Sequence, residues 1–165
     1  MTKTHTTNVA TFRTPTLGPI GLVTKNRILF LQELLETKRL DISAVNGTIP
    51  IVKAYAGMQG DLLEAIAHTK VDGLVIEALG AGNLPPQALA ALEKLLVQKI
   101  PVVLVSRCFN GIAEPVYDYE GGGKELEEMG IIFCNSINSQ KARLKLLIAV
   151  NYGLTGEELI SFIQN

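Results

Sequence analysis

The chain has 165 residues, 47% of them hydrophobic, with a mean hydropathy of +0.27 and a formal net charge of −1. This length suits one domain with an irregular arm, and the apolar content argues against a disordered chain. No apolar run approaches the roughly 20 residues of a membrane helix, and no basic block is present to follow a phosphate backbone. We therefore expect a soluble protein that binds neither membrane nor nucleic acid.

Two features of the sequence indicate where in the cell the protein is located: its cysteines and its first residues. Cys108 and Cys134 stand alone inside apolar runs, which is typical of small buried residues in a reducing environment. The first eight residues carry neither the apolar core of a signal peptide nor an acylation pattern. A cytoplasmic location is the default that follows.

Residues 1–45 are predicted to form an irregular linking arm. A turn at Lys25 and Asn26 separates residues 20–23 from residues 27–30, which is the pattern of a β-hairpin. The arm contains little apolar material from which to build a core of its own. We therefore expect it to rest on another surface, because an isolated two-stranded hairpin is marginally stable.

From residue 46 onward, β-branched runs alternate with helical segments, the pattern of an α/β fold with a parallel sheet. The strands are predicted at residues 49–55, 73–78, 101–106 and 131–134. The helices are predicted at residues 61–69, 85–98, 139–151 and 155–163. Asp61 stands at an N-cap position, Thr155 and Glu158 fit a capping box, and Gly153 supplies a helix stop. Right-handed crossovers then give one small sheet of about four strands flanked by helices.

Ligands of parallel sheets gather beyond the carboxyl ends of the strands, and two loops stand out there. The first holds Gly80, Gly82 and Asn83, where the glycines allow a tight turn and Asn83 offers an amide donor and acceptor. The alternative interpretation is that Asn83 only caps the following helix. A dinucleotide fingerprint would need a further glycine three residues after Gly82, where Pro85 stands.

The second loop follows Arg107 and ends in three consecutive glycines at residues 121–123. Such a stretch beside two tyrosines suits a mobile loop that covers a site, or a plain surface loop. Arg107 suits an anion site, or pairing with a local acid such as Glu77. His5 and His68 have no partner at the spacing of a catalytic triad or a metal site. We expect no metal and no cofactor.

Several motifs in one register resemble the C-terminal half of the bacterial-type L-asparaginase family. They are residues 2–12, Gly18-Pro19-Ile20-Gly21, Gly80-Ala81-Gly82-Asn83-Leu84, Ser106-Arg107 and residues 138–143. The resemblance covers nearly the whole chain. It implies a Rossmann-like asparaginase C-terminal domain at residues 46–165, preceded by the end of the N-terminal domain and the linker arm at residues 1–45.

The resemblance also implies site residues. Lys3 falls on the family's catalytic lysine, and Asn83 falls on the asparagine that reaches toward the α-amino end of the substrate in the neighbouring subunit's site. The family places an acidic residue shortly after the Ser-Arg strand, where it binds the substrate amine. Counting without gaps assigns that role to Asp118, with Tyr117 and Glu120 as alternatives.

The implied reaction is hydrolysis of L-asparagine to aspartate and ammonia, begun by attack of a threonine hydroxyl on the side-chain amide carbon. The family's nucleophilic threonines lie in N-terminal motifs that this sequence lacks, so we expect the chain alone to be inactive. The expected partners are L-asparagine, the missing N-terminal domain, where any targeting signal would lie, and further copies in a homo-oligomer. The alternatives are a non-catalytic α/β interaction domain and a small nucleotide- or phosphate-binding α/β protein.

Overall fold

The computed structural model describes residues 1–33, 38–135 and 137–165. Its contacts divide the chain into two compact units, Met1–Lys38 and Arg39–Asn165. The second unit contains both clusters of buried apolar side chains, so it carries the core of the molecule. No helix in the described parts is long and apolar enough to cross a membrane.

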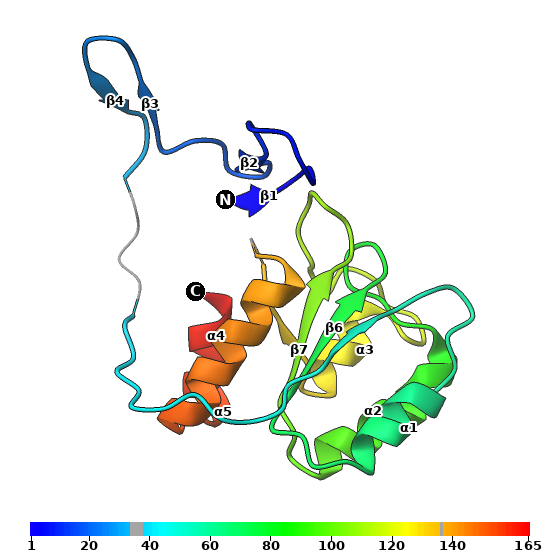
Figure 1. The fold of residues 1–165 in the computed structure, drawn as a ribbon. Coiled ribbons are helices and arrows are strands. Elements are labelled where there is room, and N and C mark those ends of the chain that lie inside the picture. Colours follow the sequence, from blue (N-terminus) through cyan, green and yellow to red (C-terminus); the bar gives the residue numbers. More distant parts are fainter. Residues whose placement is uncertain (34–37, 136) are drawn as a thin grey trace. The chain divides into compact units, whose positions relative to one another are not determined.

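A four-stranded parallel sheet forms the centre of the second unit (Figure 1). Its strands are β5 (Ile51–Lys53), β6 (Leu74–Ala78), β7 (Val102–Ser106) and β8 (Ile132–Phe133), and they lie side by side in chain order. The register places Ile76 opposite Leu104 and Leu104 opposite Phe133. The predicted α/β fold with about four parallel strands is therefore confirmed, although the outer strands are shorter than predicted.

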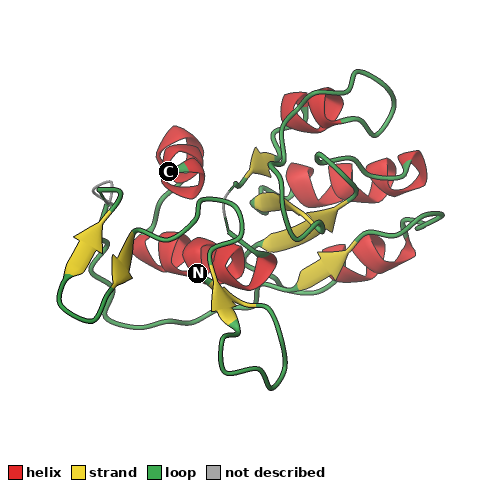
Figure 2. Cartoon of the chain, turned by 90° about the horizontal axis from the view of Figure 1, so that it is seen from above, coloured by secondary structure: helices red, strands yellow, loops and turns green. Residues whose placement is uncertain are grey.

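Helices cover both faces of this sheet, and Figure 2 shows the same layers from above. One face carries α1 (Asp61–Ala67), the 3₁₀ turn η1 (Pro86–Ala88), α2 (Leu89–Val97) and α3 (Gly123–Glu128). The other face carries α4 (Ser139–Tyr152) and α5 (Gly156–Gln164). Because the strands follow in chain order and parallel crossovers are right-handed, every crossover helix falls on the same face. The two helices after β8 then cover the opposite face.

The central strands are buried on both sides, which explains their unbroken apolar sequence. Ile76 and Leu104 point into the core under α1 and α2, whereas Val75 and Val103 point into the core under α4 and α5. All four side chains are completely buried. Period-two alternation is therefore present in the structure but invisible in the sequence, because both faces need apolar residues.

The helix ends confirm some of the predicted caps and correct others. Gly153 ends α4 in the left-handed conformation with a φ of 90°, as its position predicts. The N-cap of α1 is Gly60 rather than Asp61, which is the first helical residue, where its charge favours the positive end of the helix. Thr155 is the N-cap of α5, but its side chain makes no capping hydrogen bond, so the capping box does not form.

The sequence predicted a loop where α3 forms. Three glycines precede and open this six-residue helix, and glycine is a poor helix former. Tertiary contacts compensate, because Leu126 is completely buried and the Glu125 carboxylate accepts a hydrogen bond from the backbone N–H of Gly121. Packing and capping rather than local propensity therefore hold this helix in place.

The described residues of the first unit form two small antiparallel pairs of strands. The predicted hairpin is confirmed as β3 (Gly21–Val23) paired with β4 (Ile28–Phe30) around Lys25 and Asn26. A second pair, β1 (Thr2–Lys3) with β2 (Phe12–Arg13), was not predicted because two-residue strands leave no periodic pattern. Several large apolar side chains of this unit are exposed, namely Val9, Phe12, Leu17, Val23, Ile28 and Phe30.

Candidate functional site

An open pocket of about 680 Å³ lies beyond the carboxyl ends of β5 and β6. This is the edge at which parallel sheets bind ligands. Three loops form its wall: one after β5, one after β6, and one that precedes α3. The lining residues are Ala56, Gly57, Leu79, Gly80, Ala81, Asn83, Leu84, Pro85, Pro86, Gln87, Tyr117 and Tyr119.

The loop after β6 holds Asn83 in a tight turn. The backbone N–H groups of Gly82 and Asn83 both donate to the carbonyl of Leu79, and Leu79 donates back to Asn83. Gly80 and Gly82 adopt φ values of 51° and 120°, in the region that favours glycine. A Cβ at Gly82 would lie 2.6 Å from the ring of Phe133, so the turn also packs directly on the end of the sheet.

The Asn83 side chain does not cap the helix that follows it. Pro85 is the N-cap of η1 and makes no side-chain cap bond, whereas Asn83 Oδ1 accepts from the backbone N–H of Gly123 at 3.2 Å. Asn83 Nδ2 makes one long contact, at 3.5 Å, with the carbonyl of Leu79. The amide therefore uses one acceptor lone pair at the start of α3, and its donor makes only the long contact with Leu79.

The two loops that the sequence singled out are joined by backbone hydrogen bonds. Leu84 donates to the carbonyl of Gly121 at 2.9 Å, and Glu114 donates to the carbonyl of Ala81 at 2.8 Å. The glycines at residues 121–123 are buried, and a Cβ on each would come within 3 Å of neighbouring backbone atoms. Close backbone packing, rather than mobility, explains the run of three glycines.

Of the three residues predicted to bind the substrate amine, Tyr117 lines the pocket, whereas Asp118 and Glu120 do not. Tyr117 lines it, together with Tyr119, and the two rings are 5.7 Å apart between centroids. The Asp118 side chain is 80% exposed and pairs with Lys124 at 3.1 Å. Glu120 is exposed, and neither acid is among the lining residues.

Lys3 lies in the first unit, on β1, with its ammonium 5.6 Å from the centre of the Phe12 ring. It is exposed, and its strand pairs with β2. The pocket, Asn83 and Asp118 all belong to the second unit. The predicted catalytic lysine and the predicted substrate-binding residues thus come from separate units of the chain.

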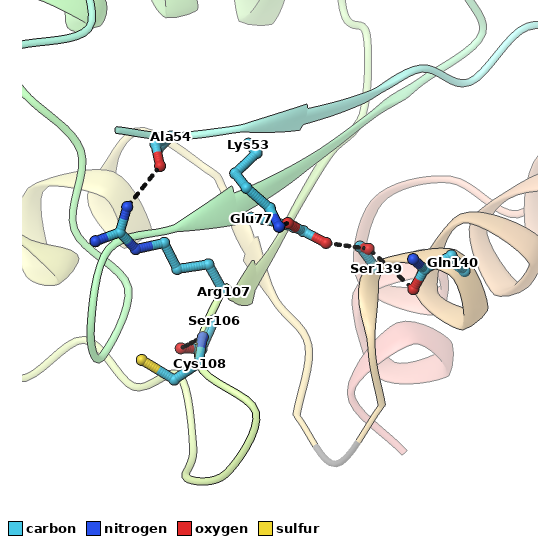
Figure 3. Close-up of polar contacts among 8 residues, drawn as sticks. All are labelled: Lys53, Ala54, Glu77, Ser106, Arg107, Cys108, Ser139 and Gln140. Atoms are coloured by element: carbon cyan, nitrogen blue, oxygen red, sulfur yellow. Dashed lines mark hydrogen bonds and ion pairs between the residues drawn. The ribbon is translucent and has the colours of Figure 1, made fainter. Parts of the chain in front are cut away.

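Arg107 and Glu77 do not pair with each other (Figure 3). Arg107 Nη1 donates to the carbonyl of Ala54 at 3.1 Å and so ties the end of β7 to the loop after β5. Glu77 instead accepts from Ser139 Oγ at 2.5 Å through Oε1 and lies 2.9 Å from Lys53 Nζ through Oε2. The second contact is an ion pair without the geometry of a hydrogen bond. Both residues therefore have structural partners.

The cysteines and histidines occupy separate places in the fold. Cys134 is buried as predicted, but Cys108 is exposed, because its strand ends at Ser106. Burial raises the pKa of the Cys134 thiol, and nearby Lys145 opposes that rise only in part. His5 and His68 are exposed and bond to local backbone groups. Within the described ranges, no three His, Cys, Asp or Glu residues are grouped to hold a metal ion.

The second half of the loop after β6, residues 82–86, is poorly suited to a phosphate group. Its backbone N–H groups at residues 82, 83 and 84 already donate to carbonyl oxygens, and the next two residues are prolines, which have no N–H. Phosphate loops work through free N–H groups that point at the anion. Residues 82–86 therefore offer an anion no free backbone N–H group.

Sequence reasoning missed the contribution of the loop after β5. Ala56 and Gly57 line the pocket, yet neither carries a side chain that suggests chemistry. They are placed by the register of β5 against β6, where Ile51 lies opposite Val75. The sequence could have indicated them only by their position directly after the first predicted strand, at the edge where parallel sheets bind ligands.

Comparison with known proteins identifies the family. The model of the Glutaminase/Asparaginase C-terminal domain matches residues 48–161. A probable L-asparaginase of Deinococcus radiodurans is 46% identical over 114 residues, covering 67% of this chain and 33% of that protein. An L-asparaginase of Bacillus licheniformis is 29% identical over 146 residues, covering 88% of this chain and 45% of that protein. The chain thus spans less than half the length of these two relatives.

A solved structure supports the fold. The crystal structure of a probable cytoplasmic L-asparaginase from Campylobacter jejuni superposes with a TM-score of 0.82 at 24% identity, over 98% of this chain and 52% of that one. The family model covers most of the second unit, which contains the four-stranded parallel sheet. The chain belongs to the glutaminase/asparaginase C-terminal domain family.

Proposed function

We propose that this chain is the C-terminal part of an L-asparaginase-type amidohydrolase, which converts L-asparagine and water to aspartate and ammonia. The observation that carries the proposal is the family match over residues 48–161, on a domain whose open pocket includes Asn83. In this proposal the chain contributes substrate-binding groups and subunit contacts. The attacking threonine comes from the N-terminal part of the complete enzyme, so the chain alone is inactive.

Asn83 is proposed to bind the substrate. Its Oδ1 accepts one hydrogen bond, from Gly123 N–H, and keeps a second lone pair for the substrate's α-amino group, while Nδ2 makes only a long contact with Leu79 and can donate to a substrate oxygen or a bound water. The acidic contribution is proposed to come from Asp118, with Tyr117 and Glu120 as the alternatives. Lys3 is proposed to assist proton transfer at the nucleophile, as its place in the resemblance implies.

Subunit association is part of the same proposal. The support for this part is the number of large exposed apolar side chains on the first unit, since an apolar patch marks a surface that meets another protein. Those of the first unit include Phe12, Leu17 and Phe30, exposed by 61%, 66% and 76%. We expect light scattering to give a molar mass above that of one chain, rising with concentration. A monomer at high concentration would contradict this part of the proposal.

The first test is ammonia release from L-asparagine, and from L-glutamine, by the purified chain. We expect no turnover by the chain alone and turnover when an N-terminal half of a full-length relative is added. In that mixture Asn83→Ala should raise KM, whereas Gln87→Ala, which alters the same pocket wall, should change it less. A complete family member is the positive control. Turnover by the chain alone that survives both Lys3→Ala and Asn83→Ala would refute the proposed site.

A further inference from the structure

The sequence contains two Asn-Gly dipeptides, Asn46-Gly47 and Asn110-Gly111. An asparagine before glycine is prone to spontaneous deamidation, because the glycine nitrogen attacks the side-chain amide carbon without hindrance from a Cβ. The two atoms must approach each other for the ring to close. The rate in a folded protein therefore depends on how firmly the local backbone is held.

Asn110-Gly111 lies in a stretch that is fastened at both ends and free between them. On one side the Cys108 N–H donates to Ser106 Oγ at 3.0 Å, and on the other the Ala113 N–H donates to Asn135 Oδ1 at 2.8 Å. Among the hydrogen bonds of the described residues, none involves residues 109–112, and all four are exposed. A Cβ at Gly111 would meet no atom within 4 Å, so the dipeptide has open space around it.

Asn46-Gly47 is held on several sides. Asn151 clamps Asn46, because its Oδ1 accepts from the Asn46 N–H at 3.0 Å and its Nδ2 donates to the Asn46 carbonyl at 2.7 Å. Asp72 Oδ2 accepts from the Thr48 N–H at 2.7 Å and would lie 2.9 Å from a Cβ at Gly47. A carboxylate at this place also disfavours the loss of a proton from the Gly47 nitrogen, which the attack requires.

We propose that Asn110 is a site of spontaneous deamidation in the folded protein and that Asn46 is protected. The Gly111 backbone nitrogen gives up its proton and forms a bond to Asn110 Cγ, the bond from Cγ to Nδ2 breaks, and the departing NH2 group takes up a proton to leave as ammonia. Water then opens the resulting succinimide to aspartate or isoaspartate. The net change consumes one water and releases one ammonia per chain, so it is independent of any catalytic turnover.

The chain offers its own internal control, because trypsin separates the two sites. Residues 108–124 and residues 40–53 each form one tryptic peptide with a single asparagine. The folded protein is first incubated in mildly alkaline buffer made with heavy-oxygen water, so that each succinimide that opens takes up the label. It is then digested with trypsin in ordinary water at weakly acidic pH, and the peptides are analysed by mass spectrometry. We expect the Asn110 peptide to acquire the label about tenfold faster or more than the Asn46 peptide, since releasing even one well-formed hydrogen bond costs about that factor.

Two further measurements separate local structure from intrinsic reactivity. In concentrated urea the rates of the two sites should converge, because the Asn151 clamp is lost. Asn151→Ala should accelerate Asn46 in the folded protein and leave Asn110 unchanged. Gly111→Ala should slow Asn110 and leave Asn46 unchanged. Three results would each overturn the proposal. They are equal rates at the two sites in the folded protein, faster labelling of Asn46 than of Asn110, and a rate at Asn46 that Asn151→Ala does not change.

Discussion

Glu77 brings a carboxylate to the carboxyl end of β6 with only 14% of its side chain exposed. Ser139 donates to one oxygen and Lys53 neutralises the other, while the first turn of α4 presents its positive end nearby. The three side chains come from β6, α4 and β5. This contact therefore links α4 to two strands of the sheet through a polar group that depends on its partners.

Removing the Ser139 hydroxyl should destabilise the fold. Ser139→Ala leaves Glu77 Oε1 without its donor in a site where Ser139 is 1% exposed, so we expect the free energy of unfolding to fall by about 1–3 kcal/mol. Urea unfolding followed by circular dichroism measures this change. Ser161→Ala, an exposed serine on α5, is the matched control and should change stability by less than about 0.5 kcal/mol. Equal effects would show that the Glu77 contact contributes nothing.

The two thiols should react at different rates. Cys108 is exposed, whereas Cys134 is 2% exposed, with its Sγ 3.3 Å from the carbonyl of Ile163. Burial raises the pKa of the Cys134 thiol, so its thiolate becomes abundant only above the usual pH range for cysteine. In the folded protein we expect iodoacetamide to modify Cys108 alone at neutral pH. Urea should make both thiols reactive, and early modification of Cys134 in native buffer would contradict its burial.

At the scale of elements, the glycines at residues 121–123 determine how closely two loops approach. Gly121 has a φ of 81°, and a Cβ there would lie 2.2 Å from the carbonyl oxygen of Leu84. Gly121 also accepts the Leu84 N–H and donates to the Glu125 carboxylate. The positions of α3 and of the loop that holds Asn83 therefore both depend on Gly121.

Gly121→Ala should lower the free energy of unfolding by more than backbone strain alone would. The matched control is Gly130→Ala, because Gly130 also has a positive φ, of 96°, but has open space around it. Strain at such a φ costs roughly 1–2 kcal/mol, so we expect about that loss for Gly130→Ala and a larger loss for Gly121→Ala. Urea unfolding measures both variants. A smaller effect at Gly121 would mean that the loops separate without cost.

The elements differ in how clearly the sequence marks them. The strand at residues 73–78 was found because its apolar run is unbroken, and the helix at residues 155–163 was found because its apolar residues recur with a clear helical period. Helix α3 was missed because its glycines signal a loop, and its stability comes from Leu126 and a side-chain cap that only the folded chain provides. Local patterns thus predict elements whose propensity agrees with their packing, and miss those where packing overrides propensity.

The candidate site shows the same limit. Asn83 and Tyr117 were identified from the positions of their loops and from the resemblance, and both line the pocket. The bond from Gly123 N–H to Asn83 Oδ1 joins residues 40 positions apart, so no local pattern announces it. Ala56 and Gly57 were missed because small side chains carry no chemical signal, and strand register alone brings them to the pocket.

At the scale of the whole molecule, the buried core is confined to part of the chain. Both buried apolar clusters lie between Ile49 and Ile163, and Leu40 is a partly buried residue that packs against one of them. By contacts, the second unit begins at Arg39. A domain at residues 46–165 remains our proposal, and we expect it to fold without the arm.

Two fragments test that proposal. We expect residues 46–165 to unfold cooperatively in urea, because they keep every fully buried side chain of the two clusters. Residues 39–165 should be more stable by roughly 1 kcal/mol, since they add the partly buried Leu40. The slope of the transition should be nearly the same for both fragments. A broad, non-cooperative transition for residues 46–165 would show that the arm is needed for folding.

The placement of α4 and α5 sets an order of events during protein synthesis. The crossover helices can cover their face of the sheet as soon as β8 has left the ribosome. The opposite face, with Val75 and Val103, stays uncovered until residues 139–165 have emerged. A nascent chain that pauses before that point exposes a flat apolar surface of β-branched residues, which is a target for chaperones and for self-association. The nascent chain therefore stays prone to aggregation until α4 and α5 have covered the second face of the sheet.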